Sequence, residues 1–157
     1  MADPTAAEQA VLGANSVFYS AFESGDLDAM SDLWVPEGHA VCIHPGWSPV
    51  VGAAAVRRSW AVIMANTPYI QFILTDVDVT VVGDVASVTC TENVLSADED
   101  TPTEGFAGGK AVTTNVFRRT PDTGPPSPGE GRPDGGWRLW IHHASPVLSG
   151  QGSDEGE

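Results

Sequence analysis

SGDLDAMSDLWVPEGHAVCIHPGW, residues 24–47, carries the strongest indication of the fold, and VVGAAAVRRSW follows it at residues 50–60. The first half predicts a short helix that ends before Pro36, because proline disfavours helical geometry in the residue before it. The second half predicts a short strand at residues 39–47 that runs into a Pro-Gly turn. Apolar side chains at helical spacing predict a further helix over residues 52–66.

The flanking segments complete an α+β pattern. Residues 5–23 predict an amphipathic helix, with Thr5 and Glu8 spaced as a capping box. Alternating apolar residues predict four later strands, the first two joined by a tight turn at residues 83–84. The predicted order is α-α-β-α-β-β-β-β, with helices over the concave face of a curved antiparallel sheet. The predicted strands are residues 70–82, 85–95, 110–119 and 137–148.

Length and composition predict one globular domain. The chain has 157 residues and is 41% hydrophobic, so we expect residues 1–150 to form a single domain. The Pro- and Gly-rich residues 120–136 predict a flexible hairpin loop, and residues 97–109 an acidic loop. Residues 151–157 predict a disordered acidic tail.

The charge balance excludes several classes of partner. Seven basic and 21 acidic residues give a net charge of −14, which repels phosphate backbones and anionic lipid headgroups. Nucleic acid and membranes are therefore not expected partners, and no apolar run approaches the ~20 residues of a spanning helix. Without a basic signal-peptide region, the chain is expected to be cytoplasmic, with Cys42 and Cys90 reduced and buried.

Three segments, in this order along the chain, resemble the ketosteroid-isomerase-like superfamily, also called nuclear-transport-factor-2-like (NTF2-like). They are residues 24–47, residues 50–60 and GWRLWIHHASP at residues 136–146. The superfamily includes SnoaL-like polyketide cyclases, and the last segment also resembles kinase association domains. The resemblance implies a cone-shaped fold around an internal cavity that holds a small-molecule ligand, with no cofactor. It also implies a homodimer through the outer face of the sheet, where Arg138, Trp140 and His142 would fit.

Strand alternation selects candidate side chains inside the cone. On the more apolar faces of the last three strands, the polar members are Glu92, Asn115 and His143. His142 falls on the opposite face. The expected ligand contacts are Phe18, Trp47, Trp60, Cys90, Phe117 and Ile141.

The resemblance also implies roles for particular residues. The isomerases carry an aspartate general base before a proline at the end of the first strand, and this position matches His44. Imidazole can act as a base near neutral pH. Asn115 matches the acid that donates a hydrogen bond to the developing oxyanion, and Phe18 matches the helix tyrosine of the oxyanion hole. Tyr19 is adjacent to Phe18 and is expected to point elsewhere.

Each catalytic candidate also has a structural interpretation. His44 could order the Pro-Gly turn, and Asn115 could be a core amide. Glu92 could orient His44 or His143, or pair with Arg57 or Arg58. His44, Glu92 and His143 could form a two-histidine, one-carboxylate metal set, but no motif spacing supports it, so no metal is expected.

Two classes of function follow. The first is a cofactor-free isomerase, cyclase or dehydratase that acts on a small apolar carbonyl compound. There His44 would be the base, Glu92 or His143 would orient it, and Asn115 would polarise the carbonyl group. The second is a non-catalytic ligand-binding or dimerisation module. The absence of the helix tyrosine favours the second class. The four polar candidates, His44, Glu92, Asn115 and His143, favour the first.

Overall fold

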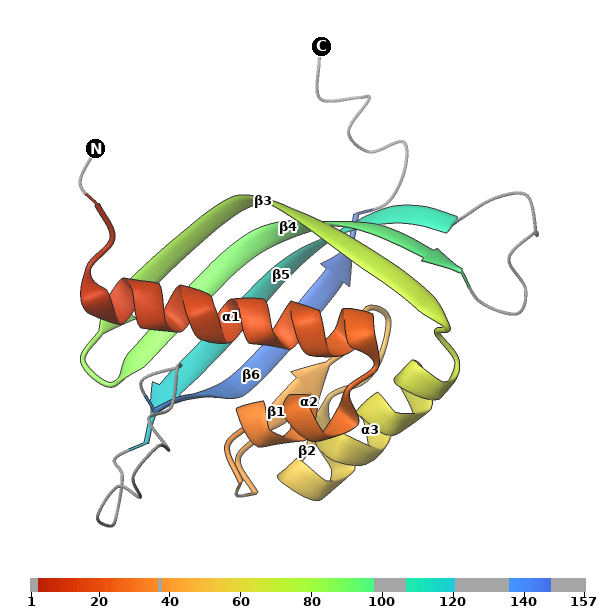
Figure 1. Ribbon diagram of the computed structural model, residues 1–157. Helices are drawn as coiled ribbons and strands as arrows, with labels where there is room; N and C mark the ends of the chain where they lie inside the picture. Colours follow the sequence, from red (N-terminus) through yellow and green to blue (C-terminus); the bar gives the residue numbers. More distant parts are fainter. Residues whose placement is uncertain (1–2, 37, 98–106, 121–135, 148–157) are drawn as a thin grey trace.

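The computed structural model describes residues 3–36, 38–97, 107–120 and 136–147 (Figure 1). The predicted acidic tail lies outside these residues, as do residues 98–106 of the predicted acidic loop and residues 121–135 of the predicted Pro/Gly loop. The predicted ends of the acidic loop were wrong, because Ala97 and residues 107–109 belong to strands. The described part contains three helices and six strands and confirms the α+β class. The elements are α1 (Ala6–Ser24), α2 (Leu27–Leu33), β1 (Val41–Ile43), β2 (Val50–Val51), α3 (Ala53–Ala65), β3 (Tyr69–Val82), β4 (Val85–Ala97), β5 (Ala107–Arg119) and β6 (Trp137–Pro146).

The helix ends follow from local sequence signals. The Thr5 hydroxyl accepts a hydrogen bond from the Glu8 amide, and the Glu8 carboxylate accepts one from the Thr5 amide, so the predicted capping box is present. Gly25 ends α1 in the left-handed conformation (φ 67°), which glycine adopts without steric cost. Asp26 then caps α2. These caps fix which face of α1 points to the sheet.

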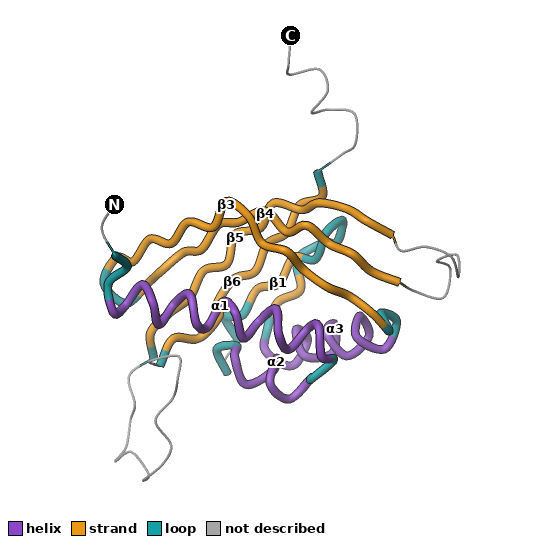
Figure 2. Tube along the Cα trace, turned by 45° about the horizontal axis from the view of Figure 1, so that its top comes forward, coloured by secondary structure: helices purple, strands orange, loops and turns teal. Residues whose placement is uncertain are grey.

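The six strands form one curved, unclosed sheet in the order β2-β1-β6-β5-β4-β3. β1 pairs parallel with β6, and the other neighbours are antiparallel, so the prediction of an antiparallel sheet was wrong on this point. The alternation of apolar residues does not encode the direction in which strands distant in sequence pair. The short strand β2 was also not predicted. Figures 1 and 2 show α1 lying across the concave face, with α2 and α3 beside one end of it.

A β-bulge in β6 determines which side chains face the helices. Val116 pairs with Ile141 and Phe117 pairs with Leu139, so Trp140 is an extra residue opposite β5. An extra residue reverses the alternation of every side chain that follows it in the strand. Leu139 is therefore buried before the bulge, and His142 rather than His143 is buried after it.

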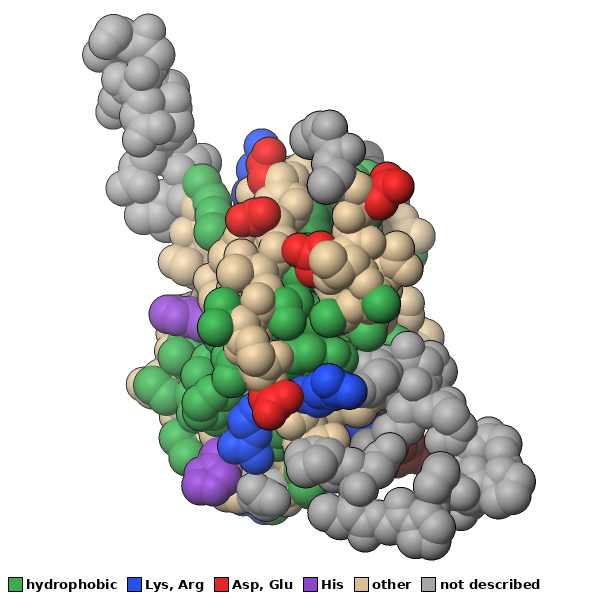
Figure 3. Space-filling model, turned by 90° about the vertical axis from the view of Figure 1, so that its left-hand side faces the viewer, with side chains coloured by type: hydrophobic (Ala, Val, Ile, Leu, Met, Phe, Trp, Pro, Cys, Tyr) green, Lys and Arg blue, Asp and Glu red, His purple; other side chains and the backbone are tan. Residues whose placement is uncertain are grey.

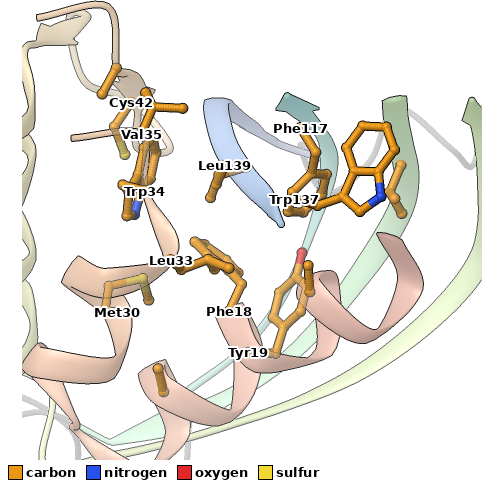
Figure 4. Close-up of a cluster of buried hydrophobic side chains, with 14 of the residues drawn as sticks. Phe18, Tyr19, Met30, Leu33, Trp34, Val35, Cys42, Phe117, Trp137 and Leu139 are labelled. Carbon is orange, nitrogen blue, oxygen red and sulfur yellow. The ribbon is translucent and has the colours of Figure 1, made fainter. Parts of the chain in front are cut away.

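The core fills the space between the helices and the concave face. Figure 4 shows Phe18 and Tyr19 from α1 projecting into this space among residues of α2 and β6. Cys42 and Cys90 are buried free thiols, as predicted. At the end of the molecule shown in Figure 3, hydrophobic side chains gather in the middle, with charged ones around them.

None of the helices in the described part is long and apolar enough to span a membrane.

Candidate functional site

A cavity of about 380 Å³ lies on the concave side of the sheet. It is enclosed by α1, α3, the loop after β1 and strands β3–β6, because the curved sheet and the helices diverge there. Its volume falls within the range of small-molecule sites. Its polar lining includes His44, Glu92 and His142. The aromatic and aliphatic lining comprises Phe18, Phe22, Trp47, Trp60, Ile63, Ile70, Phe72 and Val94.

His44 follows β1 directly and lies at the cavity wall, where it is only 2% exposed. Its Nε2 is 3.0 Å from the hydroxyl oxygen of Ser59 on α3. The rings of Trp47 and Trp60 contact it edge-on, each with its centroid 4.7 Å away. Burial lowers the pKa of His44 to about 4, so the imidazole is neutral at pH 7.

His142 is the second histidine at the cavity and is 3% exposed. Its Nδ1 is 2.6 Å from Oδ1 of Asn115, and Nδ2 of Asn115 donates a hydrogen bond of 2.8 Å to Oδ1 of Asn15 on α1. Burial lowers the pKa of His142 to about 3, with smaller contributions in the same direction from His44 and His143. This residue is therefore also neutral at pH 7.

The prediction for the histidine pair in β6 was wrong. His143 is exposed and does not line the cavity, whereas His142 lies inside and cannot belong to an outer-face interface. The cause is the bulge at Trp140, which exchanges the two faces for the rest of β6. The buried histidine pair is therefore His44 and His142, with ring centroids 6.5 Å apart.

Glu92 points into the cavity from β4, as predicted, and is buried. The phenol of Tyr19 donates a hydrogen bond of 2.6 Å to Oε2 of Glu92, so Tyr19 points inward, contrary to expectation. Burial raises the pKa of Glu92, and hydrogen bonding to Tyr19 opposes part of this shift. Arg57 pairs instead with Asp28 at 3.3 Å on the surface.

The remaining predicted residues divide into two groups. Phe18, Trp47 and Trp60 line the cavity, and Trp47 is 45% exposed. Asn115 is fully buried beneath His142, so it holds the imidazole and cannot reach a ligand carbonyl. The other three predicted contacts do not line the cavity: Cys90, Phe117 and Ile141.

The polar residues around this site that sequence reasoning missed include Tyr19, Asn15 and His142. The face of His142 depends on a bulge that strand alternation does not reveal. Asn15 lies four residues before Tyr19 on α1, so both belong to the helix face that meets the sheet, and helical spacing could have placed them there. Within the described residues, no three His, Cys, Asp or Glu side chains are arranged to hold a metal ion.

Comparisons with known proteins agree with this architecture. The protein-family model that describes the SnoaL-like domain matches residues 11–123 of this chain. A candidate dehydratase of the NTF2-like family from Streptomyces avermitilis is 48% identical, with 90% of this chain and 96% of that chain covered and a TM-score of 0.75. None of the curated proteins matches the sequence.

Two further solved structures are similar. A candidate calcium/calmodulin-dependent protein kinase type II association domain from Thiobacillus denitrificans is 28% identical, with coverage of 87% and 94% and a TM-score of 0.69. A protein from Catenulispora acidiphila in complex with S-DNPA is 16% identical, with coverage of 95% and 96% and a TM-score of 0.67. The last likeness concerns the fold alone. With its three helices, its curved sheet and the family model spanning most of its length, the chain belongs to the SnoaL-like family of the NTF2-like superfamily.

Proposed function

We propose that this protein binds a small, largely apolar carbonyl compound in the cavity and moves a proton on it without a cofactor, as an isomerase, cyclase or dehydratase does. The observation that carries the proposal is the pair of buried, neutral histidines, His44 and His142, at the wall of an aromatic cavity. The 48% identity to a candidate dehydratase supports the same class of reaction.

The two imidazoles suit proton transfer. Burial keeps each ring neutral at pH 7, so each has one nitrogen free to accept a proton, and the same burial makes it a weaker base than free imidazole. The resulting imidazolium is a strong acid in this buried setting and returns the proton readily to another atom of the substrate. Glu92 lines the same cavity, so we assign it to orient the substrate beside the two imidazoles.

Proton transfer is measurable without knowledge of the natural product. We expect the protein to accelerate hydrogen–deuterium exchange beside the carbonyl group of a neutral two-ring ketone such as 2-tetralone, followed by NMR in D2O. His44→Gln and His142→Gln are each expected to slow this exchange by about 100-fold, the contribution typical of a general base. His143→Gln, which alters the exposed neighbour in β6, is the matched control and leaves the rate unchanged. Exchange no faster than in buffer across a panel of such ketones would contradict the enzymatic function.

The second candidate is a non-catalytic ligand-binding or dimerisation module. The likeness to a candidate kinase association domain favours it. In this case the cavity binds the same apolar compounds but does not accelerate their hydrogen–deuterium exchange, so neither histidine substitution changes the exchange rate. Binding of a ketone without acceleration of exchange is the result that selects this alternative.

We also propose that the protein forms a homodimer through the convex face of the sheet. No described helix covers that face, and Ile73 and Val112 on it are 70% and 51% exposed. Apolar side chains exposed on a sheet face that no described helix covers suit an interface with a second copy of the chain. Sedimentation velocity at micromolar concentration is expected to give a dimer for the wild type and a monomer for Val112→Glu. The control Val62→Glu, on the exposed side of α3, remains dimeric. A monomeric wild type would exclude the interface.

A further inference from the structure

The hydrogen-bond partners of His44 fix which of its nitrogens carries the proton. The Ser59 hydroxyl donates its single proton to the carbonyl oxygen of Val56, at 2.7 Å. Its oxygen can then only accept from Nε2 of His44, 3.0 Å away. Nε2 is therefore protonated and Nδ1 carries the lone pair. The weakly hydrogen-bonding thiol of Cys42 lies 3.8 Å from Nδ1 and 3.5 Å from Nε2.

The partners of His142 fix the opposite tautomer. Asn115 uses its amide nitrogen to donate to Asn15, so its amide oxygen is directed at Nδ1 of His142. An amide oxygen only accepts, and Nδ1 must therefore carry the proton. Nε2 of His142 then holds a lone pair, because the hydrogen bond of this ring to a described residue uses Nδ1. Because the ring lines the cavity, this lone pair is available to a ligand.

We propose that the histidine end of the cavity recognises a hydrogen-bond donor, so that the natural ligand is a hydroxylated aromatic or alicyclic compound whose hydroxyl group donates to Nε2 of His142. The inference rests on the proposed small-molecule site and narrows its substrate class from carbonyl compounds in general to hydroxylated ones.

The charges around the cavity favour a neutral hydroxyl over an anionic group. A carboxylate would place its oxygens against nitrogen lone pairs and in the same cavity as Glu92. Among the described residues that line the cavity, Lys110 is the only Lys or Arg. It is exposed and pairs across the sheet with Asn93, next to the inward pair of Ala111 and Glu92. Alternation therefore directs its side chain to the outer face, away from the histidines.

Asn15 is a positioning residue in this arrangement. It contacts neither the cavity nor the imidazole, but its oxygen orients the Asn115 amide, which in turn determines the His142 tautomer. Without the Asn15 acceptor, the Asn115 amide is free to turn over and present its nitrogen to His142. The lone pair would then move to Nδ1, and the cavity would face an N–H donor.

The tautomers are directly measurable by long-range 1H–15N NMR of the protein labelled with 15N-histidine. In the wild type we expect a pyrrole-like Nδ1 and a pyridine-like Nε2 for His142, and the reverse for His44. Asn15→Leu is expected to mix the two tautomers of His142 and leave His44 unchanged. Asn66→Leu, at the exposed end of α3, is the control and changes neither. A pyrrole-like Nε2 on His142 in the wild type overturns the proposal, even if Asn15→Leu fails to fold.

Ligand preference provides the second test, with 2-naphthol, 2-methoxynaphthalene and naphthalene as probes in calorimetric titrations. We expect 2-naphthol to bind about tenfold more tightly than its methyl ether, the value of one net hydrogen bond, and this preference to disappear in His142→Phe. Equal binding of all three compounds would overturn the hydroxyl inference while leaving the cavity as a binding site. Absence of binding by all three would overturn the proposed function as well.

Discussion

Lowering the pH from 7 to 5 is expected to reduce the free energy of unfolding by about 4 kcal/mol through His44 and His142. In the folded state their pKa values are about 4 and about 3, whereas an unfolded histidine has a pKa near 6.5. Between pH 6.5 and pH 4 the unfolded chain therefore binds protons that the folded chain does not. The loss begins as the pH falls through 6.5 and levels off below the folded pKa values. Urea unfolding at pH 7, 6 and 5 measures it.

A double variant isolates this contribution from the rest of the molecule. His44→Gln/His142→Gln is expected to lose most of the pH dependence between 7 and 5, whereas His39→Gln/His143→Gln, at two exposed positions, retains it. Glu92 acts in the opposite direction, because its raised pKa makes the folded state bind a proton more strongly as the pH falls. This contribution is common to all the variants and cancels when they are compared. Equal pH dependence in the wild type and the buried double variant would contradict the prediction.

Asn115→Leu is expected to destabilise the protein by about 3 kcal/mol and to lower its melting temperature by roughly 6–12 °C. The substitution leaves the Nδ1–H of His142 and the Oδ1 of Asn15 buried without partners. Each stranded group costs about 1–3 kcal/mol, more than the net value of the hydrogen bond that it made. Differential scanning calorimetry at pH 8, where both histidines are neutral in the folded and unfolded states, gives the measurement.

A variant that lacks the whole Asn15–Asn115–His142 network tests why Asn115→Leu is destabilising. The cause is either polar groups left without partners or the loss of packing. The triple variant Asn15→Leu/Asn115→Leu/His142→Phe contains no unsatisfied member, so it is expected to be more stable than Asn115→Leu alone. Asn66→Leu serves as the control for the substitution itself; it removes an exposed hydrogen bond from Nδ2 of Asn66 to the carbonyl oxygen of Val62 and is expected to lower the stability by about 1 kcal/mol at most. A triple variant less stable than the single variant would show that packing dominates.

The sequence allowed prediction of the features that depend on neighbouring residues. The Thr5–Glu8 capping box, the end of α1 at Gly25 and the β3–β4 hairpin each require only a few adjacent side chains, and all three are present. The position of Glu92 also followed from alternation along one regular strand. The parallel pairing of β1 with β6 joins segments about 100 residues apart, and no local pattern records its direction.

The site was predicted less completely because it depends on irregular and long-range contacts. His44, which the resemblance to the isomerases assigned to the site, lines the cavity. Asn115 was identified, but its contact with His142 depends on the register of two strands and a bulge between them. Tyr19 was assigned to the wrong side of its helix because only Phe18 was expected to face the sheet. Both residues point inward, since the curved sheet meets a wide part of the helix surface.

The bulge at Trp140 has a consequence for the comparison of relatives. Two consecutive histidines occupy opposite faces of β6, and the one that reaches the cavity is selected by the pairing of the residues before it in the strand, not by its own identity. A relative that lacks only the extra residue would keep the first histidine inside, whereas a relative with the same number of residues paired without a bulge would place the first histidine outside and the second inside. Sequence alignments of this family therefore need to position insertions in the last strand from structure, because a gap displaced by one residue would equate a buried histidine with an exposed one.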